Sequence, residues 1–322
     1  MITGARRFAD TILATRLVGG AVRALANARG HRLILVYHRI APCESAADQV
    51  IVPTVSPELF RDHVRALAEV VDLVGLDTLL DDRAPRRSRG RAAVALTFDD
   101  DLPSHVEYAL PILEELRVPA TFFLSGRALL GLGAYWFQDL EVIVRTFGTA
   151  RAAELLNAGP ADLTQLSLRC QADAELRQRV RDCAAALHPA RVLDRAGIER
   201  LRHAGMPIGF HTASHDALPP LNDGELTQVL HRGRTELESA AATTIAYFAY
   251  PYGQADARTA HAVRGAGFVA AFTGQPSPVR QGVDPYRIGR WEPGAVSVPR
   301  LLAALAVRLH RIGRPASGEP HA

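Results

Sequence analysis

The chain has 322 residues, of which 48% are hydrophobic and 22% charged, and its formal net charge is +3. These values are ordinary for a globular protein with room for one large α/β domain and additions. All 37 basic residues are arginine, so mechanisms that need a lysine, such as a Schiff base or a P-loop, are excluded. No stretch reaches the roughly 18 uninterrupted apolar residues of a membrane-spanning helix.

Both ends of the chain predict amphipathic helices. Residues 1–30 and the C-terminal part, 299–322, each place apolar residues near helical spacing with arginines between them. Charged residues interrupt the apolar part of the start, so we expect it to be retained rather than cleaved as a signal peptide. Two interpretations stay open: both helices pack on the protein surface, or both lie on an anionic membrane. The second predicts a cytoplasmic enzyme with peripheral membrane contact.

Between these ends, short apolar runs alternate with amphipathic stretches, a pattern that predicts a parallel α/β arrangement. Ser56 and Pro57 are typical of a helix start. Residues 82–91 are rich in arginine without interleaved aromatics, so we expect a solvated loop and no nucleic-acid partner. Residues 131–193 show helical periodicity and predict an inserted helical segment. We expect strands at 33–37, 70–76, 92–98, 120–124, 207–210, 245–249 and 268–272, and helices from 57 and at 106–116, 198–203, 225–237 and 258–264.

Polar residues that suit a metal site follow two of the expected strands. The apolar run 92–98 ends in Asp99, Asp100 and Asp101, and His211 and His215 follow another apolar run. Two histidines and a carboxylate are a common zinc ligand set. Adjacent residues of an extended segment point in different directions. One aspartate could therefore bind a metal while its neighbour acts as a base on water, which is the chemistry of a hydrolase.

Three segments of the chain resemble the motifs of the polysaccharide deacetylases, the carbohydrate esterase family with the NodB homology domain. They are 97–100 (Thr-Phe-Asp-Asp), 211–215 (His-Thr-Ala-Ser-His) and 248–253 (Phe-Ala-Tyr-Pro-Tyr-Gly), and the last form is similar to poly-N-acetylglucosamine deacetylases. The resemblance spans about 33–290 and implies a distorted (β/α)7-type parallel barrel within 31–298. It also implies roles for residues at matching positions: Asp99 as base, Asp100, His211 and His215 as ligands of Zn²⁺ or a similar divalent ion, and Tyr250, Pro251 and Tyr252 as walls of the substrate groove.

The chain departs from the usual family pattern at several positions. Asp101 replaces a glycine, and the third motif lacks the arginine that orients the base. The family's Leu-x-x-His motif occurs here at 35–38, as in circularly permuted members, which makes His38 the candidate general acid. A histidine with only a structural hydrogen bond is the alternative. Arg290 follows the last expected strand, where the family has a motif that tunes its catalytic groups, and it is a candidate substrate-binding residue. The alternative is an ion pair with Glu292 or another surface acid.

The leading functional hypothesis is removal of N-acetyl groups from an N-acetylhexosamine-containing polysaccharide or lipid-linked glycan. An O-deacetylase that uses the same site and a non-catalytic glycan-binding barrel are the alternatives. The expected partner is therefore a glycan. Trp136 and Phe137, at the start of the insert, could either stack on a sugar or pack the insert onto the barrel.

Overall fold

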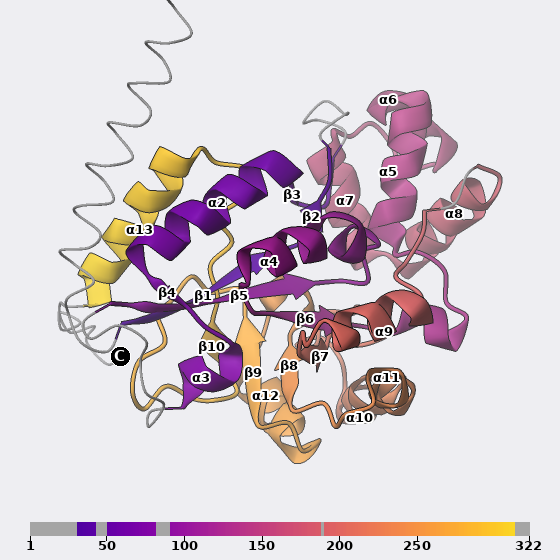
Figure 1. Cartoon of the computed structure of the whole chain (residues 1–322). Coiled ribbons are helices and arrows are strands. Elements are labelled where there is room, and N and C mark those ends of the chain that lie inside the picture. The colour runs from indigo at the N-terminus through magenta and orange to yellow at the C-terminus, as the bar shows by residue number, and fades with distance from the viewer. Residues whose placement is uncertain (1–30, 43–49, 82–90, 188–189, 313–322) are drawn as a thin grey trace, which may run out of the picture.

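Seven parallel strands form a nearly closed barrel in the computed structural model, which describes residues 31–42, 50–81, 91–187 and 190–312 (Figure 1). This confirms the (β/α)7 prediction. A further short strand, β4 (Asp72–Leu73), pairs with β5 beside the barrel. The barrel strands run in the order β1 (Arg32–Tyr37), β5 (Ala93–Asp99), β6 (Ala120–Leu124), β7 (Ile208–Phe210), β8 (Tyr247–Ala249), β9 (Ala270–Thr273) and β10 (Ile288–Gly289).

The backbone of Trp291 joins the last strand to the first. Its N–H donates to Ile34 O at 2.8 Å, and its carbonyl accepts from Val36 N at 3.0 Å. Strand residues then alternate between two apolar clusters. Ile34 belongs to the cluster inside the barrel, whereas Leu33 and Leu35 belong to the larger cluster under the helices. Because both faces are buried, each strand reads as a continuous apolar run in the sequence.

Helices cover the outside of the barrel. Ser56 Oγ caps the first of them by accepting from Leu59 N at 3.2 Å. The single helix expected over 225–237 is wrong, because Gly233 has φ +82° and a Cβ there would lie 2.8 Å from Leu130. The covering helices are α2 (Pro57–Val70), α3 (Leu76–Leu80), a π-helical turn (His105–Ala109) that continues into α4 (Leu110–Leu116), α9 (Arg195–His203), α10 (Asp223–His231), α11 (Arg234–Ala241) and α12 (Ala257–Gly265).

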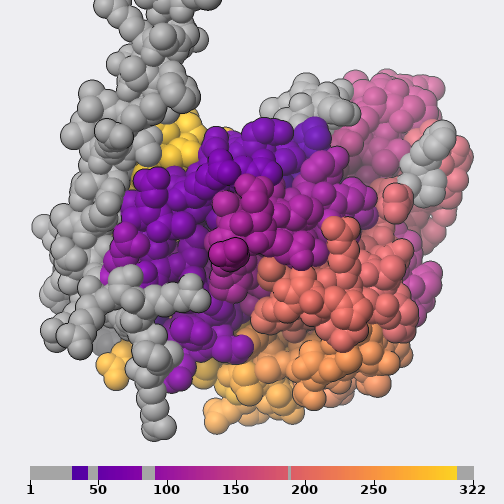
Figure 2. All heavy atoms as spheres, in the orientation of Figure 1, coloured from indigo at the N-terminus to yellow at the C-terminus, as the bar shows by residue number. Residues whose placement is uncertain are grey.

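A lobe of helices stands beside the barrel, between β6 and α9 in the chain (Figure 1), and its atoms form the upper right part of the surface in Figure 2. It has an apolar core of its own, in which Leu140, Leu166 and Val180 are fully buried. Near it, the two-stranded sheet of β2 (Arg39–Ile40) and β3 (Thr54–Val55) follows β1. The helices of the lobe are α5 (Trp136–Phe147), α6 (Thr149–Leu155), α7 (Leu163–Ala172) and α8 (Ala174–Ala185).

The C-terminal helix α13 (Val298–Ile312) packs against α2 (Figure 1). Leu301, Leu305 and Leu309 on its apolar face are fully buried in the main core. The packing interpretation is therefore the correct one for this helix, since its apolar side is not available to a membrane. The corresponding prediction for residues 1–30 lies outside the described residues. No helix in the described part of the chain is both long and apolar enough to cross a bilayer.

Candidate active site

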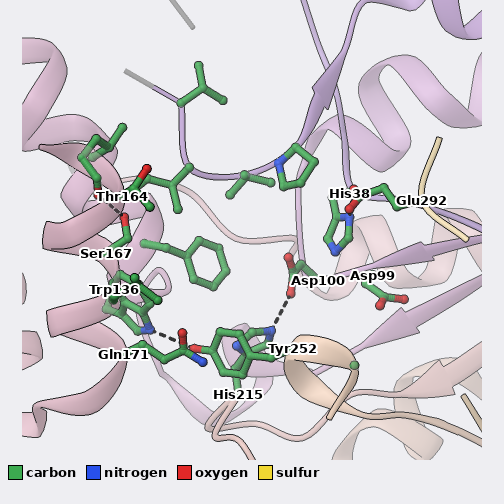
Figure 3. Close-up of a pocket in the computed structure, with 18 of the residues that line it drawn as sticks. His38, Asp99, Asp100, Trp136, Thr164, Ser167, Gln171, His215, Tyr252 and Glu292 are labelled. Carbon is green, nitrogen blue, oxygen red and sulfur yellow. Dashed lines mark hydrogen bonds and ion pairs between the residues drawn. The ribbon is translucent and has the colours of Figure 1, made fainter. Parts of the chain in front are cut away.

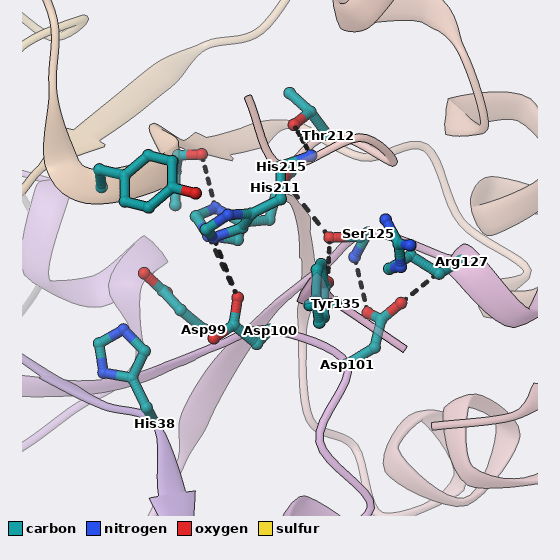
Figure 4. A network of polar contacts seen from close by, with 12 residues as sticks. His38, Asp99, Asp100, Asp101, Ser125, Arg127, Tyr135, His211, Thr212 and His215 are labelled. Carbon is teal, nitrogen blue, oxygen red and sulfur yellow. Dashed lines mark hydrogen bonds and ion pairs between the residues drawn. The ribbon is translucent and has the colours of Figure 1, made fainter. Parts of the chain in front are cut away.

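Asp100, His211 and His215 come together at the carboxyl ends of β5 and β7, where parallel barrels carry their sites (Figure 4). One ligand atom from each residue lies within 4.8 Å of the other two. Asp100 Oδ1 is 3.7 Å from His211 Nε2 and 3.2 Å from His215 Nε2. All three side chains are buried. The structure thus brings the three predicted ligands into one cluster.

The local backbone explains why neighbouring aspartates point to different places. Alternation along β5 directs Asp99 to the barrel interior, and Asp100 then has φ +74°. A positive φ is unfavourable for a residue other than glycine. His105 stabilises this turn, because its Nε2–H donates to the carbonyls of Asp99 at 3.0 Å and Asp100 at 2.9 Å. Burial lowers the pKa of His105 to about 4, so the ring is neutral.

The hydrogen bonds of the cluster fit a bound cation. His211 Nδ1 donates to Ala249 O at 2.8 Å, which leaves a lone pair on Nε2. Burial lowers the pKa of His211 to about 4, so this ring too is neutral. A bare nitrogen therefore faces a carboxylate oxygen, an arrangement that repels unless a cation lies between them. A backbone carbonyl bound to the other ring nitrogen is typical of metal-ligating histidines.

Arg290 binds both oxygens of Asp99, at 2.7 Å and 2.6 Å, and both side chains are almost fully buried. Burial opposes ionisation of Asp99, but the guanidinium holds the pKa of this carboxyl below its usual range. Arg290 is thus neither paired with Glu292 nor available as an independent substrate contact. The guanidinium thus reaches Asp99 from a segment distant from the third motif, which has no arginine.

His38 lies beside Asp99 and Asp100 at the same end of the cleft, and its hydrogen-bond partner is Glu292 (Figure 3). Its Nδ1 is 3.0 Å from Glu292 Oε1. Burial opposes the charged imidazole, but this hydrogen bond and nearby carboxylates raise the pKa of His38 to about 9. His38 is therefore a cation near neutral pH. Sequence reasoning considered Glu292 only as a surface partner of Arg290 and missed this contact.

Asp101, the residue in place of the family's glycine, turns away from the ligand cluster (Figure 4). Its carboxylate accepts from the backbone N–H groups of Ser125 at 2.7 Å and Arg127 at 2.8 Å. The Arg127 guanidinium in turn donates to the carbonyl of Ala213, a residue between His211 and His215 in the sequence, at 2.7 Å, and lies 4.5 Å above the ring of Tyr135. Asp101 therefore supports the loop around the site without crowding it.

The third motif divides between the cleft and the core. Tyr252 lines the cleft, with its ring edge-to-face on His215 at 4.7 Å between centroids. The prediction that Tyr250 is at the groove wall is wrong: this side chain is fully buried and donates its hydroxyl to Tyr286 O at 2.9 Å. Pro251 is also buried, next to the wall rather than in it. Strand alternation accounts for this, because Tyr250 shares the outer face with Phe248.

Trp136 and Phe137 pack against other side chains and also line the cleft. Both line the cleft, so they lie where a sugar could contact them. Both also pack: the Trp136 indole N–H donates to Tyr252 Oη at 3.3 Å, and the Phe137 ring lies 5.4 Å from that of His215. The start of the insert is therefore attached directly to the ligand cluster.

Comparison with known proteins identifies the fold and the family of the chain. The chain has the fold of three solved structures: a deacetylase (PplD) from Streptococcus pyogenes in complex with acetate (16% identity, 86% of this chain and 98% of that chain, TM-score 0.60), IcaB from Ammonifex degensii (22%, 86% and 97%, 0.58) and a de-N-acetylase from Aggregatibacter actinomycetemcomitans (17%, 84% and 96%, 0.55). No curated protein matches the chain significantly. The family model described as "Polysaccharide deacetylase" matches residues 86–271. The chain therefore belongs to the polysaccharide deacetylase family.

Proposed function

We propose that the protein is a metal-dependent hydrolase that removes N-acetyl groups from an N-acetylhexosamine-containing glycan. One observation carries the proposal: a carboxylate held by a buried arginine, Asp99 with Arg290, lies beside a candidate ligand set and a cationic histidine, His38, at one end of the cleft. These are the parts that hydrolysis of an amide requires: a base, an electrophile and an acid.

Asp100, His211 and His215 would hold the metal, and two imidazoles with one carboxylate suit Zn²⁺. When bound, such an ion lowers the pKa of water and polarises a carbonyl. The hydrogen bond to Ala249 O orients His211 for metal binding, and all three candidate ligands are buried. The set supplies three protein ligands, as catalytic zinc sites do, so coordination positions remain for water and substrate.

Asp99 is the proposed general base. Arg290 keeps its carboxylate ionised and fixes its orientation, so that an oxygen can accept a proton from the attacking water. Arg290 is a positioning residue in this scheme, since it acts through Asp99.

His38 is the proposed general acid. Glu292 holds Nδ1 and favours the protonated ring, and Figure 3 shows the other ring nitrogen on the side of Asp99 and Asp100. That nitrogen can donate its proton to the departing amine, giving acetate and a free amino sugar. An amine is a poor leaving group without this proton, so a cationic His38 favours N-deacetylation over ester cleavage.

Acetate release from N-acetylated oligosaccharides, measured together with bound metal, tests the proposal. Asp99→Asn should retain metal and lose turnover by about 10²–10⁴-fold. His211→Ala should lose both, whereas His261→Ala, a change at an exposed histidine on α12, should lose neither. An Asp99→Asn variant with near-normal turnover would contradict the assigned base. Full metal retention in His211→Ala would contradict the ligand set.

A further inference from the structure

The cleft continues well past the polar cluster. Its volume is about 1040 Å³, at the upper end of the roughly 300–1,000 Å³ that sites for drug-sized ligands occupy. Figure 3 shows His38, Asp99 and Asp100 at one end and Thr164, Ser167 and Gln171 of α7 at the other. We call the part between Phe137 and α7 the distal arm. None of the proposed chemistry uses it.

The distal arm is lined mostly by apolar side chains. Two of the polar side chains that reach the distal arm already form hydrogen bonds with the backbone of α7. Ser167 Oγ donates to Leu163 O at 2.8 Å, and the Asp162 carboxylate caps the helix by accepting from Gln165 N at 2.8 Å. Thr164 and Gln171 also reach it. Apolar residues that line the cleft away from the polar cluster include Ile51, Phe137, Leu163 and Leu168.

One wall of the distal arm is held in place by a buried carboxylate. Glu141 of α5 accepts from the backbone N–H groups of Ile51 at 2.7 Å and Val52 at 2.8 Å. Arg39 pairs with the same carboxylate at 2.7 Å, and the Glu141 side chain is only 3% exposed. The segment that carries Ile51 and Val52 is thereby fixed to the insert. The arm is a preformed groove rather than a gap between loosely packed parts.

One exposed apolar side chain of the insert borders the groove. Five large apolar side chains are exposed in the described part of the chain, and three of them, Phe147, Leu155 and Leu168, are on the insert. Leu168 is 59% exposed and lines the groove at the same time. Single exposed apolar residues are common, but here one continues an apolar groove that begins at the candidate active site.

We propose that the distal arm binds a hydrocarbon chain, and that the substrate is an acetylated saccharide linked to a lipid. The inference rests on the proposed function, since it places the sugar at Asp99 and His38. A second sugar in the arm would direct its hydroxyls at the apolar side chains of Ile51, Phe137 and Leu168. Binding would then be weakened, because buried hydroxyls without hydrogen-bond partners cost free energy. An alkyl chain removes the same side chains from water without that cost. Continuity of the groove with the candidate site selects an apolar group attached to the reacting sugar.

A series of N-acetylglucosaminides tests this proposal with the full chain. Methyl, hexyl, octyl and decyl glycosides, kept below their micelle concentrations, are compared with N-acetylated oligosaccharides of two to four sugars. A buried methylene contributes about 0.8 kcal/mol, so kcat/KM should rise by up to about fourfold per methylene while the chain lies in the groove. Turnover of the methyl glycoside without a chain-length effect, or a gain only with added sugars, would overturn the proposal. No turnover of any of these substrates would instead contradict the proposed function.

A substitution at the groove rim provides a second test. Leu168→Ser removes apolar surface at an exposed position, so folding should tolerate it, and it should lower the octyl-to-methyl ratio of kcat/KM by about fivefold. The matched control is Val307→Ser on α13, 52% exposed and not among the groove residues, which should keep the ratio. Inhibition of methyl glycoside turnover by octyl β-glucoside, which has no acetyl group, reports chain binding apart from chemistry. An unchanged ratio and unchanged inhibition in Leu168→Ser would overturn the proposal.

Discussion

Replacement of Arg290 by methionine tests whether the carboxylate proposed as base depends on a partner 191 residues away in the sequence. The substitution keeps an unbranched side chain of comparable length but removes the guanidinium. Asp99 would then retain a charge that is 95% buried and that has lost both of its bonds to Arg290. Desolvation would no longer be opposed by this cation, so the pKa of Asp99 should rise.

The expected cost follows from the geometry of the pair. Removing one partner of a buried ion pair typically costs about 3–5 kcal/mol, because the other charge stays buried without compensation. Asp99→Asn should lower the unfolding free energy for the same reason, because it leaves the guanidinium of Arg290 without its counter-ion. The Arg290 side chain is only 2% exposed. The double variant contains neither charge. It should therefore be more stable than the sum of the single effects predicts, by about 2–3 kcal/mol.

Urea unfolding of the metal-free protein, followed by circular dichroism, gives the four stabilities of this cycle. The acid limb of the pH–rate profile of the single Arg290→Met variant should also move to higher pH, because its Asp99 binds a proton more readily. Additive effects in the cycle would refute the reasoning. So would a loss below about 1 kcal/mol in Arg290→Met, the scale of an exposed ion pair.

Three other predictions follow from the remaining contacts. Glu292→Gln removes the anion that favours the cationic form of His38, so the pKa of His38 should fall from about 9. The basic limb of the pH profile of kcat/KM should then move to lower pH. An unchanged basic limb would contradict His38 as the general acid. Arg127→Lys cannot reproduce the planar contact with Ala213 O, and affinity for Zn²⁺, measured by competition with a chelator, should fall about 10–100-fold. The pKa of His105 is lowered to about 4 in the folded protein, so as the pH falls this histidine is protonated first in the unfolded chain. The difference in unfolding free energy between wild type and His105→Asn, measured by urea unfolding, should therefore shrink by about 2 kcal/mol between pH 7 and pH 5. A difference that stays constant with pH would contradict the neutral ring.

The sequence predicts the barrel and the centre of the site because both depend on local patterns. Asp99, Asp100 and His211 each follow an apolar run long enough to be a buried strand. The carboxyl ends of parallel strands meet at one edge, so this information is enough to bring these residues together. It is also enough to separate Asp99 from Asp100, because strand alternation is a property of the backbone.

What the sequence does not reveal depends on contacts between distant segments. Arg290 follows β10, a strand of two residues, Ile288 and Gly289, which is too short to give a periodic signal. The position of Tyr250 depends on which residues of the three-residue strand β8 face outward, and a shift of one residue in this alternation would move the Tyr250 side chain to the other face. The two helices at 223–241 are separated by Arg232, whose backbone is extended, and by Gly233, which has a left-handed conformation.

The same strand pairing closes the barrel and completes both halves of the candidate chemistry. Trp291 pairs through its backbone with β1, the strand that ends just before His38. Arg290 and Glu292 flank Trp291, and in extended backbone residues two apart share a face. One therefore meets Asp99 inside the barrel mouth while the other meets His38, and the Trp291 ring lies outward under Arg308, 3.9 Å from the guanidinium carbon. A barrel left open at this seam would lose the partner of the base and the partner of the acid together. Closure of the fold is thus a condition for the charge states of both residues.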